Sequence, residues 1–114
     1  MSNRYADVWA DAAGAASANR ERNAIARRYR RMLALTDDLL GHLEPLNAAG
    51  GGELPPPMRR AIERVATRLD PDLQIGLLSC RTIQEAVDTV LAVQDEVLRR
   101  LHGRAPTEQE RRTA

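Results

Sequence analysis

The chain has 114 residues, a length that supplies one modest hydrophobic core and excludes two well-packed ones. Apolar residues make up 43% and charged residues 29%, a globular composition that excludes a charge-rich disordered chain. The 17 basic residues, all arginine, are nearly balanced by 16 acidic ones, so the net charge of +1 selects neither nucleic acid nor an anionic membrane.

The N-terminal region predicts two helices. Tyr5, Val8 and Trp9 follow helical spacing in a short first helix, and we expect a hinge at Gly14 because glycine is a poor helix former. A longer amphipathic helix is expected over roughly residues 17–44, where apolar side chains recur every three or four positions. Its apolar stripe consists of Ile25, Tyr29, Met32, Thr36, Leu39, Leu43 and Leu46, widened by Leu33 and Leu40.

Residues 47–57 read N-A-A-G-G-G-E-L-P-P-P and form the one clear break in the helical pattern. Three glycines and three prolines oppose both helix and sheet, so we interpret this segment as a hinge or linker. A helix is expected from about Pro57 to Leu69, because proline suits the first helical position. A brief apolar helix should then begin at Pro71, with Asp70 as its cap.

A last helix is predicted to begin at Ile83. Thr82 and Glu85 have the spacing of a capping box, in which each side chain bonds a backbone amide at the helix start. Gly103 is the expected terminator. Gln94 lies at the centre of this helix's apolar stripe, where an unpaired amide costs about 1–3 kcal/mol. It therefore either fixes the helix register or contacts a bound peptide, and the first interpretation is preferred.

The predicted fold is all-α, a small four- to five-helix bundle with a Gly/Pro-rich hinge between two hairpin-like helical halves. The single domain spans residues 1–103, with N-terminal helices in 1–46, the linker in 47–57 and C-terminal helices in 58–103. Residues 104–114 contain no apolar anchor that offsets the entropy cost of ordering them. We therefore expect a flexible, disordered C-terminal tail.

Cysteine usage and hydropathy predict the cellular compartment of the protein. Cys80 is the one cysteine, which excludes an intramolecular disulfide. The first residues lack the apolar segment of a secretory signal, and no stretch approaches the ~20 apolar residues that span a bilayer. The sequence predicts a cytoplasmic protein without membrane insertion.

We expect no catalytic, metal or cofactor site, and therefore no enzyme. His42 and His102 belong to none of the spacings that metal sites use. Cys80 follows Leu77 and Leu78, which favours a core position over a nucleophile. The triple glycine lacks a following Lys-Ser or Lys-Thr and does not follow a strand, so it is not a phosphate-binding loop.

The strongest charge cluster lies between residues 20 and 31, where six arginines accompany one glutamate. A solvated helix face or an acidic protein partner is preferred over nucleic acid, because no interleaved aromatic residues offer base stacking. The N-terminal aromatics either dock on their own bundle or capture a partner. The candidate partner-binding residues are Tyr5, Val8, Trp9, Arg20, Arg22, Ile25, Arg27 and Tyr29.

Several short segments resemble the flagellar FlaF family. Tyr5-Ala6-Asp7-Val8, and then Arg20-Glu21-Arg22 with Ala24, Ile25 and Arg27, resemble its amino-terminal pattern. Leu54-Pro55 with Arg59, Arg60 and Ile62 is similar to its Leu-Pro-x-x-Leu-Arg segment, and the helix ending at Leu101 and Gly103 is similar to its carboxyl end. The resemblance implies a helical cytoplasmic factor that binds flagellin, supports its production and export, and acts opposite a second regulator, without catalysis.

Three hypotheses follow from the sequence. The first is a non-enzymatic protein-binding factor, a flagellin chaperone or regulator of flagellin synthesis and export. The second is a nucleic-acid-binding regulator that contacts phosphates through Arg20, Arg27, Arg28, Arg30 and Arg31. The third is a self-assembling helical structural or adaptor protein, because the long helix carries about three heptads.

Overall fold

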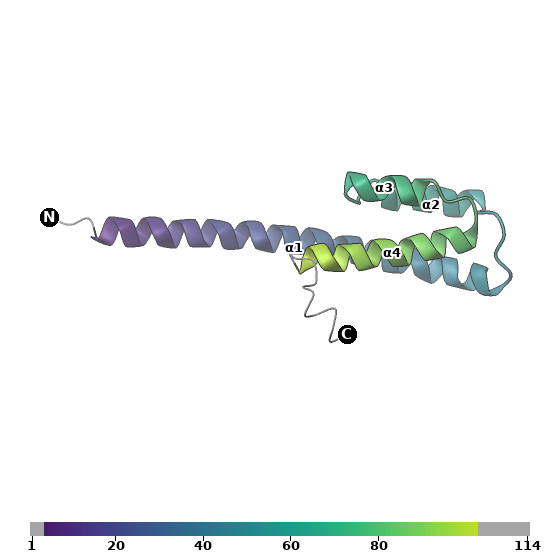
Figure 1. Ribbon diagram of the computed structural model, residues 1–114, viewed down its shortest axis with the longest axis horizontal. Coiled ribbons are helices and arrows are strands. Elements are labelled where there is room, and N and C mark those ends of the chain that lie inside the picture. The colour runs from purple at the N-terminus through teal and green to yellow at the C-terminus, as the bar shows by residue number, and fades with distance from the viewer. Residues whose placement is uncertain (1–3, 103–114) are drawn as a thin grey trace, which may run out of the picture.

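The computed structural model describes the backbone of residues 4–102 and the side chains of residues 14–102. This part of the chain contains four helices, which confirms the all-α prediction (Figure 1). They are α1 (Arg4–Ala48), α2 (Pro56–Ala66), α3 (Pro71–Leu78) and α4 (Ile83–Leu101). None of these helices combines the length and apolar character that a bilayer crossing requires.

The first helix is continuous for 45 residues, or roughly 67 Å at 1.5 Å per residue. The predicted break at Gly14 is therefore wrong, and the N-terminal half is one helix instead of two. An exposed glycine costs a helix only about 1 kcal/mol, which the alanines on both sides of Gly14 offset. The helix also passes the expected end at residue 44 and contains Pro45.

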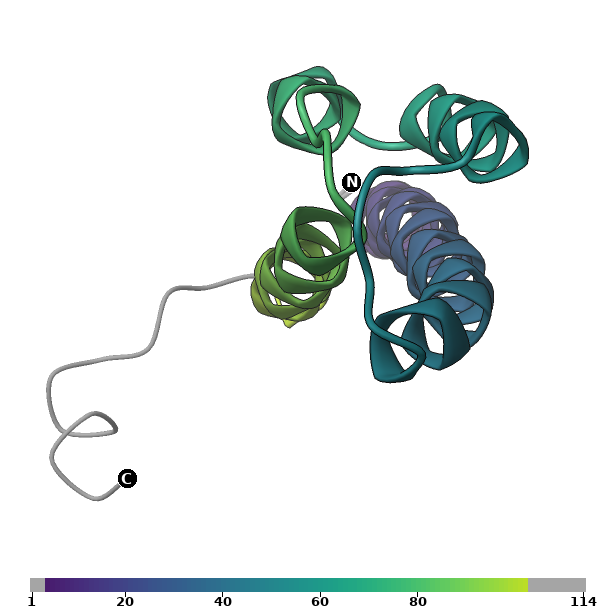
Figure 2. The ribbon, with the colours of Figure 1, turned by 90° about the vertical axis from the view of Figure 1, so that its right-hand side faces the viewer.

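The four helices lie at the corners of a square when viewed end-on (Figure 2). α1 lies beside α4, and α2 lies beside α3 in a second layer. α1 contacts α4 far more extensively than it contacts α2. The predicted pair of hairpin-like halves is therefore wrong, because the main partner of the first helix is the last one.

The core is built from the facing stripes of α1 and α4. Most of the predicted α1 stripe is buried, and Tyr29, Leu33 and Leu46 pack against the edge of the core. The fully buried side chains of these two helices include Met32, Leu39, Leu43, Val90 and Val97. These positions confirm that the apolar periodicity marks the core-facing sides of both helices.

Ile25 is the exception within the predicted stripe. Its side chain is 50% exposed, because this part of α1 extends beyond the ends of the other helices (Figure 1). We call residues 14–28 the projecting half of α1 and residues 29–48 the packed half. Ile25 therefore lies on the predicted apolar stripe but outside the hydrophobic core.

The Gly/Pro segment between α1 and α2 is anchored to the start of α4. Gly50, Gly51 and Gly52 have φ of 118°, 69° and 101°, a region that favours glycine. The Gly52 carbonyl accepts the Ile83 amide at 2.8 Å, and the Leu54 amide donates to the Arg81 carbonyl at 3.1 Å. Hinge motion about this segment stays a prediction.

The other helix boundaries agree with the sequence in part. α4 begins at Ile83 as predicted, and Thr82 Oγ1 accepts the Glu85 amide at 3.1 Å. The Glu85 carboxylate accepts the Arg81 amide at 2.9 Å, one residue before the position expected for a capping box. α3 begins at Pro71 as expected, whereas α2 ends at Ala66 instead of Leu69. Gly103 and the predicted tail, residues 104–114, lie outside the described residues.

Gln94, which is partly buried, and Cys80, which is buried, agree with the preferred sequence interpretations. Gln94 Nε2 donates to Thr36 Oγ1 at 3.3 Å, and Thr36 itself donates to the Met32 carbonyl at 2.8 Å. This bond joins α4 to α1 and supports the register role of Gln94. Cys80 is buried, and its thiol lies 3.4 Å from the Gly76 carbonyl, as expected for a core cysteine.

Candidate functional site

The predicted partner-binding residues lie mainly on the projecting half of α1. Arg20, Arg22 and Arg27 are exposed, and Tyr29 is half-buried where this half begins. Tyr5, Val8 and Trp9 belong to the α1 helix, but their side chains lie outside the described residues. Arg27 lines a hollow together with Thr67, Arg68 and Leu69, which follow α2.

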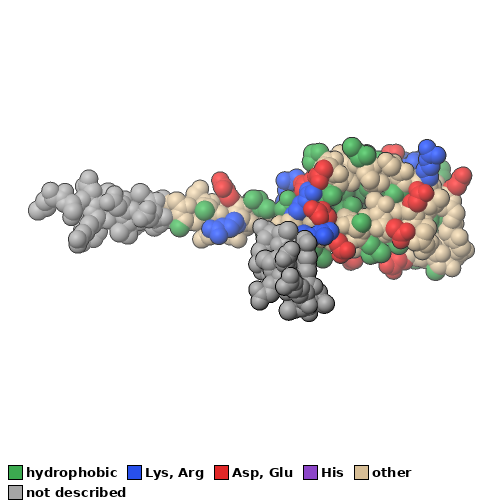
Figure 3. Space-filling model, viewed as in Figure 1, with side chains coloured by type: hydrophobic (Ala, Val, Ile, Leu, Met, Phe, Trp, Pro, Cys, Tyr) green, Lys and Arg blue, Asp and Glu red, His purple; other side chains and the backbone are tan. Residues whose placement is uncertain are grey.

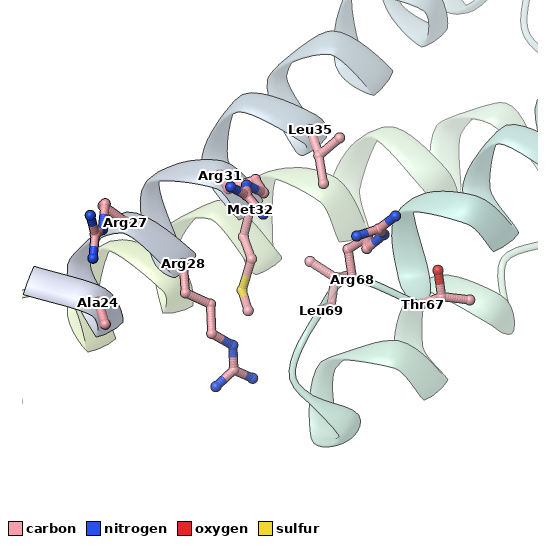
Figure 4. A pocket seen from close by; sticks show the side chains of 9 residues that line it. All are labelled: Ala24, Arg27, Arg28, Arg31, Met32, Leu35, Thr67, Arg68 and Leu69. Atoms are coloured by element: carbon pink, nitrogen blue, oxygen red, sulfur yellow. The ribbon is translucent and has the colours of Figure 1, made fainter. Parts of the chain in front are cut away.

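That hollow belongs to a groove between α1 and α2. Two adjoining hollows of about 560 and 520 Å³ share the side chains of Arg31, Leu35 and Arg68, and we call the two together the α1/α2 groove. Figure 4 shows the first hollow, with arginines along α1 on one side and Arg68 on the other. The remaining lining residues are Ala24, Arg27, Arg28, Met32, Asp38, Leu39, His42, Ala61, Arg64, Val65, Thr67 and Leu69.

The groove exists because α1 packs closely on α4 and only lightly on α2. The α1 side chains that line it recur at intervals of three or four residues, from Ala24 to His42, and so form one line along the helix. The α2 side chains nearest the floor are the small Ala61 and Val65, which leave space between the helices. Helical periodicity therefore places one row of side chains on each side of the space.

The rim of the groove is strongly basic. Arg27, Arg31, Arg64 and Arg68 have no salt-bridge partner among the described residues. Asp38 is the one acidic side chain among the residues that line it, and its Oδ2 lies 3.9 Å from His42 Nε2. The groove therefore presents an excess of positive charge beside an apolar floor.

Sequence reasoning found only part of this rim. It identified the arginines of α1 but not Arg64, which lies on α2, or Arg68, which lies in the turn after α2. Their spacing of four residues was the available signal, because the helix expected from about Pro57 to Leu69 would place such a pair on one face. The structure does not bring Arg20 or the candidate residue Arg22 to the groove.

A buried carboxylate holds α1 at the end of the groove. Asp70 accepts the Tyr29 hydroxyl at 3.1 Å and Arg100 Nη1 at 2.7 Å, and it also pairs with Arg28. Asp70 is only 7% exposed, and we call these four residues the Asp70 clasp. It joins α1 to the start of α3 and the end of α4 at the point where the projecting half begins, where basic and acidic side chains gather on the surface (Figure 3).

The clasp also changes the titration of its members. Burial raises the pKa of Tyr29, and the hydrogen bond to Asp70 and the negative charge of that carboxylate raise it further. Arg100 also donates two hydrogen bonds to Asp72, which lies outside the clasp, at 3.1 and 2.5 Å, and these bonds lower the pKa of Asp72. The lowered pKa favours the charged form of Asp72, and the raised pKa favours the neutral form of Tyr29.

The groove offers charge and apolar surface, which suit binding. Among the described side chains, no three His, Cys, Asp or Glu residues gather in a way that would hold a metal ion. The Asp38–His42 pair is exposed, at 80% and 67% of the two side chains, so water surrounds both groups. The α1/α2 groove thus combines a basic rim and an apolar floor with one exposed Asp–His pair.

The described residues form four helices, and the α1/α2 groove between two of them has a basic rim and an apolar floor. Comparisons with models of protein families, with curated proteins and with solved structures find no match for the chain. The likeness to the FlaF family rests on short sequence segments.

Proposed function

We propose that the chain is a non-enzymatic protein-binding factor that takes a helix of another protein in the α1/α2 groove. The observation that carries this proposal is the combination of an apolar floor with four arginines that lack described partners. Burial of apolar surface supplies affinity, and complementary charge orients the partner. A groove between two helices suits an amphipathic helix, a recurring mode of peptide recognition.

Flagellin is the proposed partner. The segments that resemble the FlaF family support a cytoplasmic flagellin chaperone, or a regulator of flagellin synthesis and export. Two of these segments, around Arg20 and Ile25, lie on the projecting half of α1. Arg27, which follows them, lines the groove. The exposed Ile25 gives this half an apolar contact for the same partner.

Calorimetric titration of the purified chain with monomeric flagellin tests the partner and the groove separately. Leu35→Glu places a charge on the groove floor and should weaken binding at least tenfold, a loss of about 1.4 kcal/mol. Leu91→Glu is the matched control, because Leu91 is 46% exposed on α4 and does not line the groove. Circular dichroism checks that both variants keep their helices.

Each result tests a different part of the proposal. Absence of flagellin binding by the unmodified chain contradicts the partner. Binding that Leu35→Glu and Leu91→Glu leave equally strong contradicts the groove. Trp9→Ala asks whether the N-terminal aromatic residues contribute, and unchanged affinity removes Trp9 from the binding surface.

A nucleic-acid-binding regulator is the second candidate, favoured by the convergence of Arg27, Arg31, Arg64 and Arg68 on one groove. Phosphate contacts by such residues make affinity fall steeply with salt, in proportion to the number of phosphates bound. The described lining has no aromatic side chain for base stacking, which ranks this candidate second. Oligonucleotide binding that does not depend on salt would remove it.

A further inference from the structure

The α1/α2 groove has a pattern that specifies the chemistry of its occupant. Arg27 and Arg31 form a row on α1, and Arg64 of α2 forms a second row with Arg68, which lies in the turn after α2. Arg27 and Arg31 are spaced by four residues, so they lie one helical turn apart on one face of α1. The apolar floor lies between the two rows and contains Met32, Leu35, Leu39, Ala61, Val65 and Leu69.

The length of the groove indicates the length of the occupant. Its α1 side runs from Ala24 to His42, a rise of about 27 Å at 1.5 Å per residue. A helix of about 18 residues spans that distance. Arginines spaced by one turn match carboxylates spaced by one turn on a facing helix, whereas an extended strand of this length would place its side chains at other intervals.

The charges are unequal along the groove. Arg27, Arg31 and Arg68 surround the hollow at the Asp70 clasp, and no acidic side chain lines that end. Asp38 and His42 lie at the other end, beside Arg64. A helix that places most of its carboxylates over the first hollow therefore has the better electrostatic fit.

We propose that the α1/α2 groove binds an acidic amphipathic helix of a partner protein, about 18 residues long, with an apolar stripe on the floor and carboxylates facing both arginine rows. The inference rests on the proposed function and adds the chemistry of the partner. The carboxylates neutralise arginines that have no partner among the described residues. The apolar stripe covers Leu35, Ala61 and Val65, the floor side chains that are partly exposed.

A synthetic peptide tests this proposal without knowledge of the natural partner. The probe is a fluorescein-labelled peptide of about 18 residues with leucines at helical spacing and glutamates on both flanks. One companion has the same composition with the leucines distributed around the helix, and another has glutamine in place of every glutamate. We expect the first peptide to bind the full chain at least tenfold more tightly than either companion, as measured by fluorescence anisotropy.

Charge reversal locates the bound peptide. Arg31→Glu combined with Arg68→Glu should weaken binding at least tenfold, because both arginines line the groove. Arg30→Glu combined with Arg59→Glu is the matched control, since Arg30 on α1 and Arg59 on α2 are exposed but do not line the groove. The control changes the net charge equally and should alter affinity by less than about twofold at physiological salt.

A peptide of reversed charge tests the proposal even if a double variant is destabilised. A peptide with lysine in place of glutamate should bind the Arg31→Glu, Arg68→Glu variant more tightly than it binds the unmodified chain. Equal binding of the amphipathic peptide and its companions overturns the proposal, as does equal weakening by the two double variants. A single-stranded oligonucleotide that binds more tightly than the peptide, with the same sensitivity to Arg31→Glu and Arg68→Glu, also overturns it in favour of nucleic acid.

Failure of the peptide experiment is distinguishable from failure of the flagellin titration that tests the proposed function. If flagellin binds and the acidic peptide does not, the inference about groove chemistry is wrong and the protein-binding function stands. If the peptide binds through Arg31 and Arg68 and flagellin does not bind, the groove chemistry is correct and the flagellin assignment is wrong.

Discussion

The two halves of α1 belong to one continuous helix but depend on different interactions. In the packed half, Met32, Thr36, Leu39 and Leu43 are at most 2% exposed. In the projecting half, the same spacing continues to Ile25, which is 50% exposed. The helix therefore continues because its alanines and arginines are good helix formers, while burial ends with the last neighbouring element.

The boundary between the halves coincides with the Asp70 clasp. Arg28 and Tyr29 are the last residues of α1, counted towards the N-terminus, that contact the rest of the bundle through hydrogen bonds described here. Beyond them, the described residues of α1 form no hydrogen bond or salt bridge with another helix. The comparison teaches that a periodic stripe predicts the side of a helix that faces a core, but not where the core ends.

The largest expected effect is a difference in unfolding free energy between two substitutions by alanine, one in each half of α1. Leu43→Ala removes a fully buried side chain and should destabilise the fold by about 2–5 kcal/mol. Ile25→Ala removes a half-exposed one and should cost less than about 1 kcal/mol. Urea unfolding followed by circular dichroism measures both, and equal costs would contradict the division into halves.

A smaller loss is expected at the boundary itself. Asp70→Asn removes the charge that Arg28 and Arg100 share, at a site only 7% exposed, and should cost about 2 kcal/mol. Asp95→Asn is the matched control, because Asp95 is exposed on α4 and forms no salt bridge within the described residues. Urea unfolding of both variants separates the clasp from a general effect of net charge.

The same glycine substitution should act differently in the two halves. Gly41 and Gly14 both lie in α1, and a Cβ added at either one meets nothing within 4 Å. Gly41→Ala in the packed half should raise the free energy of unfolding by up to about 1 kcal/mol, through helix propensity. Gly14→Ala should raise helical content by circular dichroism without shifting the unfolding midpoint. A shift of similar size for Gly14→Ala would show that the projecting half unfolds together with the bundle.

Local sequence signals accounted for much of the fold. Thr82 and Glu85 gave the start of α4, Pro71 gave the start of α3, and apolar periodicity gave the buried sides of α1 and α4. These features depend on residues near one another along the chain, where spacing and capping rules apply directly.

The groove and the clasp depend on residues far apart in the sequence. Asp70 has the pattern of a helix cap, yet its carboxylate makes no capping bond and instead pairs with Arg28 and Arg100 from two other helices. Which face of α2 lies opposite α1 also follows from tertiary packing, so Arg64 and Arg68 gave no recognisable site on their own. Periodicity supplies the faces of helices, and packing decides which faces meet.

The smallest expected effect concerns the phenol of the clasp. The pKa of Tyr29 lies above its ordinary value of 10.0 because burial and the bond to the Asp70 carboxylate both disfavour the phenolate. The stability that this side chain contributes is therefore fully present below about pH 10 and is lost as the pH rises through the raised pKa.

An ultraviolet titration of the native chain should show a tyrosine component above pH 10 that Tyr29→Phe removes, leaving Tyr5 as the remaining tyrosine. Because Tyr29→Phe also removes one hydrogen bond to Asp70, it should lower stability at neutral pH slightly and make stability less dependent on pH in the alkaline range. A late component that persists in Tyr29→Phe would place the perturbed phenol outside the clasp, and would contradict the view that this contact marks the end of the packed half.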